Sequence, residues 1–338
     1  VGAALLMIAG EFDLSVGSMI GFAGMMLAIP VLYWGWPISV AVVFAVMVAM
    51  ALGWVNGYLL IRTGLPSFIV TLAGMLVFRG VTYLVLQNRP IGPVPKDFQI
   101  LSTGFLPDFL WFLSSDPATS TIKNWGALVI VLVAVGWMIY NGFSKRAANT
   151  RHGSENEPFL FFALQTGITA VVAIFLGFQL STYKGLPNVL VVLTILTVLY
   201  AFFTENTVTG RRIYALGGNE KAAKLSGIRT DRLVFYTFIN MGVLAALAGM
   251  IIASRLNSAT PKAGVGFELD VIAACFIGGA SASGGVGKIT GAVIGAFIMG
   301  VMNNGMSIMG LGIDYQQLVK GLVLLAAVYF DVYNKKRG

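Results

Sequence analysis

Carboxylates inside apolar surroundings are the residues of this sequence that could do chemistry. Glu11 and Asp13 stand in GEFDLSVGS (residues 10–18), directly after the apolar run VGAALLMIA. One interpretation is a loop between two helices, with both acids facing water. The other is a break in a membrane helix, where a carboxylate caps freed backbone N–H groups or lines a solute path. The rest of the chain has to decide between the two.

A second motif later in the chain resembles the first. FDLSV at residues 12–16 and FELDV at residues 267–271 both read phenylalanine, acid, leucine, short polar residue, valine. An Asn-Gly pair follows each motif, and six residues after each pair stand a glycine and an aliphatic residue. Because both signatures recur in the same order, we predict an internal repeat. The candidate residues for the two breaks and a solute path beside them are Asp13, Ser15, Asn56, Glu268, Asp270 and Asn304.

The composition places the chain in a membrane. Of its 338 residues, 57% are hydrophobic and 11% are charged, and the mean hydropathy is +0.84, whereas a soluble domain carries about 25% charged residues. The predicted fold class is therefore all-α, a polytopic membrane helix bundle. The net charge of +8 then reports orientation rather than nucleic-acid binding. The single cysteine, Cys275, excludes an internal disulfide, and the sequence suggests neither a metal site nor a cofactor.

Ten apolar segments follow the opening run and fit membrane spans, each of which needs about 20 apolar residues. The sequence also begins inside an apolar run, so we expect an upstream segment with at least one further span. The segment 271–283 is too short to cross untilted and ends in a Gly/Ser stretch, which favours a broken helix. The expected spans are 17–33, 38–61, 68–86, 125–143, 159–180, 188–204, 234–254, 271–283, 289–308 and 317–333.

Basic residues orient these spans. If every span crosses, 14 of the 22 Lys and Arg residues fall on one side and six on the other, so the first side, with the C-terminus, is expected to be cytoplasmic. FDLSV then lies toward the inside and FELDV toward the outside. Inverted repeats with broken helices are typical of transporters. We favour a capping role for the acids over direct solute contact, and we explain the two cations within spans, Arg79 and Lys320, by snorkelling.

The stretch YALGGNEKAAKLSGIRTDR (214–232) reads as a short helix on the cytoplasmic side. The Gly217-Gly218 pair predicts a flexible turn, Asn219 a helix N-cap and Glu220 an acid in the first helical turn. Gly227 is a plausible C-cap. Such a helix, tied to the following span, could carry force from a soluble partner. The alternative is an ordinary basic loop that obeys the positive-inside rule.

Several stretches together resemble one family. They are GEFDLSVGS, GGNEKAAKLSGI, FELDVIAACFIGGASASGGVGKITGAVIGAFI and NNGMSIMG with DYQQLVKG. In combination they are similar to the permease subunits of ABC importers for monosaccharides, above all the xylose-type or multiple-monosaccharide branch. The resemblance implies a homodimer in the bacterial cytoplasmic (inner) membrane, two cytosolic ATP-binding subunits and an extracytoplasmic sugar-binding protein. It also implies that the ATPase is contacted by Asn219, Glu220, Ala222, Ala223, Leu225, Ser226 and Gly227.

The function expected from this resemblance is passage of a monosaccharide, a pentose such as xylose or a related aldose, by alternating access. ATP would be hydrolysed on partner subunits, because GGVGKI at 284–289 lacks the Ser or Thr of a phosphate-binding loop. An ion-coupled secondary sugar carrier remains an alternative, since inverted repeats and carboxylates permit it. A membrane enzyme is disfavoured, because the only histidine, His152, has no His or Cys cluster and no nucleophile triad beside it.

The expected organisation is one transmembrane permease domain, 1–338, built from two repeats around inserted spans. Its parts are the first repeat (1–86), an extracytoplasmic loop (87–124), inserted and connecting spans (125–204), a cytoplasmic coupling loop (209–232) and the second repeat (234–333).

Overall fold

The computed structural model describes residues 1–110, 112, 122, 124–151 and 157–337, so His152 lies outside the described residues. Over the described part the chain forms helices and loops, with two isolated β-bridges. Eight of these helices are long and apolar enough to cross a membrane. These findings confirm the predicted all-α polytopic fold class.

Two compact units divide the chain, Val1–Gln99 with Val192–Gly338 (unit 1) and Ile100–Val191 (unit 2). Two helices, α5 (Lys96–Thr103) and α8 (Asn188–Asn206), pass from one unit into the other. The remaining helices of unit 1 are α1 (Gly2–Ile8), α2 (Val16–Tyr33), α3 (Ile38–Thr63), α4 (Ser67–Leu86), α9 (Val208–Gly218), α10 (Glu220–Leu225), α11 (Thr230–Leu256), α12 (Phe267–Ile277), α13 (Ile289–Ile308) and α14 (Ile313–Arg337).

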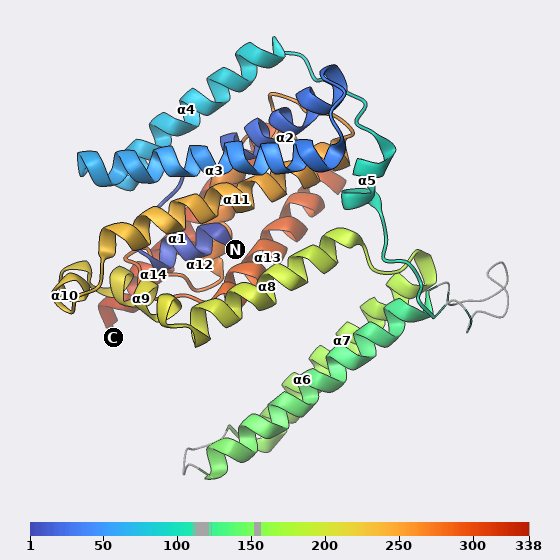
Figure 1. Ribbon diagram of the computed structural model, residues 1–338. Helices are drawn as coiled ribbons and strands as arrows, with labels where there is room; N and C mark the ends of the chain where they lie inside the picture. Colours follow the sequence, from blue (N-terminus) through green and yellow to red (C-terminus); the bar gives the residue numbers. More distant parts are fainter. Residues whose placement is uncertain (111, 113–121, 123, 152–156, 338) are drawn as a thin grey trace. The chain divides into compact units, whose positions relative to one another are not determined.

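Unit 2 is built on a pair of long helices, α6 (Trp125–Arg151) and α7 (Phe159–Tyr183), which pack side by side (Figure 1). Two polar side chains set where α6 begins. The Asp108 carboxylate accepts hydrogen bonds from the backbone N–H groups of Trp125 and Gly126, and Asn124 accepts one from Ala127. These bonds satisfy amides that a helix N-terminus otherwise leaves free.

Small residues let the central helices of unit 1 approach closely. The helix α11 packs along both α3 and α2 (Figure 1). A Cβ on Gly53 of α3 would lie 2.3 Å from the Phe238 carbonyl oxygen, and one on Gly242 of α11 would lie 2.3 Å from the Ala49 carbonyl oxygen. Membrane helices associate through such tight contacts because lipid offers no hydrophobic drive to helix pairing.

Both predicted breaks are present. The first apolar run forms α1, whose seven residues are all buried, and the chain leaves helical structure before α2 begins at Val16. Near the other end α12 has 11 residues and ends at Ile277, before the glycine-rich loop that leads to α13. The acidic motifs FDLSV and FELDV stand at the start of α2 and α12. The opening motif therefore lies between two helices, with Asp13 buried rather than facing water.

Three details differ from the sequence expectations. The segment 87–124 was expected to be a loop, yet it contains α5, whose eight residues are too few and on average too polar to reveal it. The last span is longer than 317–333, since α14 has 25 residues, but α12 and α14 are not among the eight candidate spans. Gly217 and Gly218 form no turn; they end α9.

Candidate functional site

The first break holds a buried chain of polar side chains. The Asp13 carboxylate accepts hydrogen bonds from both the backbone N–H and the hydroxyl of Ser15, at 2.7 and 2.6 Å. The amide of Asn56, on α3, donates to the same hydroxyl at 2.9 Å. All three residues are buried. The structure thus brings together the three residues that the sequence assigned to the first repeat.

The start of α4 satisfies the backbone of this break. Ser67 accepts a hydrogen bond from the Phe12 N–H and Thr71 accepts one from the Leu14 N–H, each at 3.1 Å. Broken backbone persists at membrane depth only when its freed groups find partners inside the protein. The hydroxyls of α4 are such partners, and the first break is therefore held by tertiary contacts. The sequence did not single out Ser67 or Thr71.

The second motif carries its acids differently. Glu268 lies 3.6 Å from the Arg79 guanidinium of α4, and Asp270 accepts a hydrogen bond of 2.8 Å from the Lys320 ammonium of α14. The snorkelling explanation for the two cations is therefore wrong, because both turn toward carboxylates in the protein interior. Unpaired charges in a membrane are costly, and pairing lowers that cost.

Asn303, rather than the expected Asn304, completes this second cluster. The Asn303 amide donates to Asp270 at 3.1 Å, whereas Asn304 is exposed. Asp270 occupies the same place in FELDV as Ser15 does in FDLSV, and each accepts from an asparagine on a later helix. Two asparagines, Asn303 and Asn304, stand side by side here. The prediction named Asn304 because the Asn-Gly signature contains the second of them, whereas the first makes the contact.

The short helix predicted within residues 214–232 is present as α10. Asn219 caps it by accepting from the Ala222 N–H at 3.0 Å. Gly227 follows the helix with φ of +81°, and Ile228 N–H donates to the Ala223 carbonyl at 3.1 Å, which is the Schellman pattern that favours glycine. Of the predicted coupling residues only Ala223 is buried, while Leu225 is 90% exposed.

Backbone contacts tie α9 to the first break. The Gly285 N–H donates to the Ile8 carbonyl at 2.9 Å. A Cβ on Gly217 would lie 1.9 Å from that Ile8 oxygen and 2.5 Å from the Gly285 nitrogen, and one on Gly284 would lie 2.7 Å from the Cα of Gly10. We call these three meeting segments, 8–10, 217–218 and 284–285, the glycine junction. Its glycines allow this close packing.

The pKa of Glu11 also reflects how close this segment lies to α10. Burial raises the pKa of the Glu11 carboxyl; a hydrogen bond from Ser67 lowers it, and the nearby negative charge of Glu220 raises it further. The first residue of α10 therefore lies within electrostatic reach of the chain between α1 and α2.

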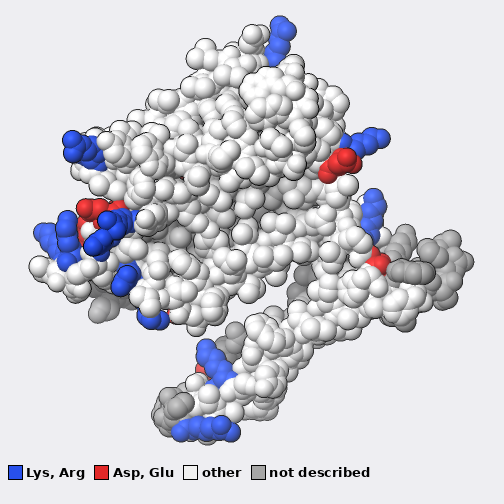
Figure 2. Space-filling view, viewed as in Figure 1, with Lys and Arg blue, Asp and Glu red and all other residues white. Residues whose placement is uncertain are grey.

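Charge gathers at the two ends of unit 1. Figure 2 shows Lys and Arg over the end where α9 and α10 lie and again at the opposite end, with the wall of the bundle white between them. The exposed basic residues on and beside α10 are Arg211, Arg212, Lys221, Lys224, Arg229 and Arg232. An uncharged wall between charged ends is what a lipid bilayer selects.

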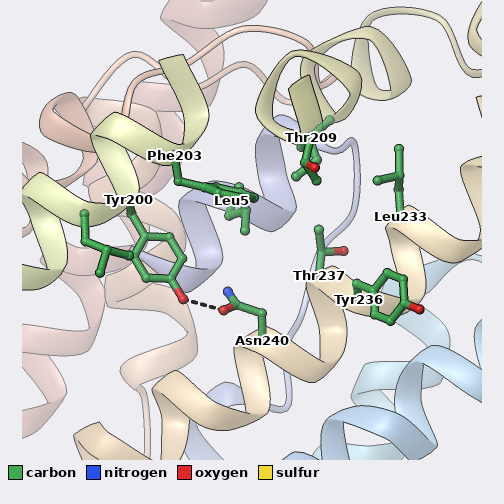
Figure 3. A pocket seen from close by; sticks show the side chains of 10 residues that line it. Leu5, Tyr200, Phe203, Thr209, Leu233, Tyr236, Thr237 and Asn240 are labelled. Atoms are coloured by element: carbon green, nitrogen blue, oxygen red, sulfur yellow. Dashed lines mark hydrogen bonds between the residues drawn. The ribbon is translucent and has the colours of Figure 1, made fainter. Parts of the chain in front are cut away.

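A pocket of roughly 640 Å³, its open mouth included, lies between α1, α8, α9 and α11 (Figure 3). Within its lining the Tyr200 hydroxyl donates to the Asn240 side-chain carbonyl, which joins α8 to α11. Most of the lining is apolar, and none of the predicted site residues belongs to it. Within the described residues, no three His, Cys, Asp or Glu side chains gather as a metal site would require.

Comparisons with known proteins match this chain to permease proteins of transport systems, and the relatives match over its whole length. A family model described as "Branched-chain amino acid transport system / permease component" matches residues 1–142 and 141–328. The chain is 38% identical over 337 residues to the xylose transport system permease protein XylH of Escherichia coli K12, covering 100% of this chain and 82% of that protein. XylH of Haemophilus influenzae is 35% identical over 340 residues (100% and 86%). The ribose import permease protein RbsC of Escherichia coli K12 is 32% identical over 339 residues (100% and 81%). No solved structure matches the chain.

Proposed function

This chain belongs to the permease family described for branched-chain amino acid transport, and from that premise we propose that it is the membrane subunit of an ATP-driven monosaccharide importer. The observation that carries the proposal is the similarity to XylH, which covers 100% of this chain. Similarity to RbsC supports the same solute class. The expected solute is a pentose such as xylose, or a related aldose, rather than the amino acid in the family's description.

Transport would proceed by alternating access at the interface of two copies of the chain in the bacterial cytoplasmic membrane. A neutral polyhydroxyl solute needs hydrogen-bonding groups along its path. The predicted path residues Glu268, Asp270 and Asn304 lie on α12 and α13, and we keep them as candidates with Asn303 added. Asp13, Ser15 and Asn56 are buried in a closed network, and we assign them to holding the first break.

Force would enter the permease through α10. We propose that a cytosolic ATP-binding subunit contacts its exposed face, that Leu225 inserts into that subunit, and that the C-terminus lies on the same side. The glycine junction supports a route inward, because displacement of α9 meets the end of α1 backbone to backbone. A contact without intervening side chains transmits displacement with little loss, since close-packed interiors compress poorly.

The same proposal assigns the site of ATP hydrolysis and adds one further partner. ATP hydrolysis would take place on the cytosolic subunits, and a sugar-binding protein outside the membrane would deliver the solute. The ion-coupled carrier is not supported, because the relatives are named as permease proteins of a xylose transport system and of ribose import, and their similarity extends over the whole chain.

The test is reconstitution of the chain with its ATP-binding subunits in proteoliposomes, with its binding protein outside. We expect ATP-dependent uptake of D-xylose or D-ribose, none of leucine, and no dependence on a proton or sodium gradient. Uptake driven by an ion gradient without ATP would refute the proposal.

A pair of adjacent glycines tests the coupling route in the same vesicles. Gly217→Ala places a Cβ against the Ile8 oxygen, whereas nothing lies within 4 Å of a Cβ on Gly218. We expect Gly217→Ala to reduce uptake per ATP hydrolysed at least fivefold and Gly218→Ala to leave it unchanged. Equal ratios in two well-assembled variants would remove the junction from the mechanism.

A further inference from the structure

The segment between α12 and α13, residues 278–288, is a loop closed by its own hydrogen bonds. We call it the α12–α13 loop. The Ser281 N–H donates to the Val286 carbonyl at 3.1 Å, and the Gly284 N–H donates to the Ser281 carbonyl at 3.2 Å. Gly284 and Gly285 have φ of +75° and +73°, in the left-handed region that glycine enters most readily. The loop therefore has a defined shape of its own.

Two helices meet this loop beside the glycine junction. The Gly285 N–H donates to the Ile8 carbonyl, at the end of α1. The Tyr214 hydroxyl, on α9, donates to the Gly287 carbonyl at 2.7 Å. A displacement of α9 would therefore reach the α12–α13 loop as well as α1.

A third helix, α14, holds the loop through one carboxylate. Asp331 accepts a hydrogen bond from the Ala282 N–H at 3.0 Å and another from the Ser281 hydroxyl at 3.2 Å. Both donors reach the same Asp331 oxygen. Hydrogen bonds to a carboxylate are stronger than those to a neutral acceptor, so Asp331 fixes where the loop lies against α14.

Asp331 and Lys320 lie on the same face of α14. Their separation of 11 residues is about three helical turns, or about 16 Å along the axis. Leu324 and Val328 lie between them on this face and pack against the core. Lys320 binds Asp270 near the start of α12, whereas Asp331 binds the loop that follows the end of α12. The helix α14 thus braces α12 at both ends, with a cation at one and an anion at the other.

The two helices that the loop connects touch backbone to backbone. A Cβ on Gly291 of α13 would lie 2.1 Å from the Gly278 carbonyl oxygen, and one on Gly295 would lie 1.9 Å from the Ala274 carbonyl oxygen of α12. Close-packed interiors compress poorly. A displacement of the loop would therefore carry α12 and α13 together.

We propose that Asp331 is a positioning residue for transport, which makes α14 move with the α12–α13 loop when displacement enters through α9. The inference rests on the proposed function, because it presumes that force enters through α10. With the Asp331 bonds in place, Lys320 follows Asp270 and the second break moves as a unit. Without them the loop moves past α14, and the Asp270–Lys320 pair is pulled apart instead of carried. ATP is then still hydrolysed, but less solute passes for each ATP.

The experiment measures D-xylose uptake and ATP hydrolysis together, with the whole assembly in proteoliposomes. Asp331→Ala removes the acceptor, and we expect uptake per ATP hydrolysed to fall at least threefold while the assembly still forms and hydrolyses ATP. Asp331→Asn keeps an acceptor oxygen for the Ala282 N–H and should recover most of the ratio. The matched control is Asp314→Ala, which removes an exposed acid from the same helix and should keep the wild-type ratio.

Three outcomes would overturn the proposal. A lower melting temperature of Asp331→Ala with an unchanged ratio would make Asp331 a structural support alone. Equal losses in the Ala and Asn variants would show that the bonds to the loop are not what matters, and a loss in Asp314→Ala would make the effect unspecific. If Asp331→Ala fails to assemble, Ser281→Ala removes one of the two bonds and gives the same test, with a smaller expected fall. If the proposed function itself fails, the wild-type assembly shows no ATP-driven uptake at all, which is a different result.

Discussion

Side chains hold the two breaks by different chemistry. Around Asp13 the partners are hydroxyls and an amide, all buried. Around Glu268 and Asp270 the partners are Arg79 and Lys320 from other helices, with the Asn303 amide as a second donor to Asp270, and the charged side chains keep 12–22% exposure. Positions two apart on a helix point to different sides, so α12 is attached to α4 through one acid and to α14 through the other. The first break is a closed network, whereas the second joins three helices through charge.

Adjacent asparagines test which residue completes the second cluster. Asn303→Ala removes the 3.1 Å bond to Asp270, and we expect a loss of about 1 kcal/mol, or roughly 2–4 °C in melting temperature. Asn304→Ala, at an exposed site one residue away, should change nothing. Thermal unfolding of the two purified variants in one detergent gives the comparison. A greater loss in the Asn304 variant would reinstate the register inferred from the repeat.

Removing a cation should cost more than removing an amide. Arg79→Ala leaves the Glu268 carboxylate, 12% exposed, without its countercharge, and we expect about 2 kcal/mol of destabilisation. The exchange R79E/E268R keeps the pair and should recover part of the loss. Arg62→Ala, at an exposed position on α3, is the control. If the exchange is no more stable than Arg79→Ala, the pair contributes nothing as a pair.

At the scale of the element, α10 is stabilised by the residues that cap its two ends. Six residues are too few for a helix to persist on propensity alone, so the Asn219 cap and the Gly227 turn define it. These two residues were identified correctly from the sequence, because capping is a local interaction. The contact between α9 and the end of α1 was not, since Gly217 and Ile8 lie far apart in the sequence.

Changing the cap should loosen α10 in a graded way. Asn219→Ala removes the acceptor of the Ala222 N–H, at a cost of about 1 kcal/mol, while Asn219→Asp keeps an acceptor and should cost little. Hydrogen exchange of the amides at 221–225 is the measurement, with faster exchange expected in the alanine variant alone. Identical exchange in all three proteins would show that packing, rather than capping, maintains the helix.

At the scale of the whole molecule, both partner assignments depend on which side of the membrane each end of α11 faces. The proposal requires Ser226 inside and Lys262 outside, at opposite ends of α11. Ser226→Cys and Lys262→Cys place thiols at exposed sites, and the native Cys275 is buried. We expect a membrane-impermeant maleimide to label the 262 variant in intact cells and the 226 variant only after permeabilisation. The reverse pattern would invert the topology and refute both partner assignments.

Composition, hydrophobic runs and local motifs determined the class of this protein: a multi-pass helical membrane protein with breaks at two acidic motifs and a capped short helix at 220–225. These features depend on neighbours within a few residues or on totals over the chain, both of which a sequence displays directly. Tertiary structure alone decided which charges meet. It paired Arg79 with Glu268 and Lys320 with Asp270, and it joined Ile91 to Ala259 through two backbone hydrogen bonds. Those pairings depend on how the helices pack. The type of a residue does not reveal which side chain from a distant part of the sequence will lie next to it in the folded protein.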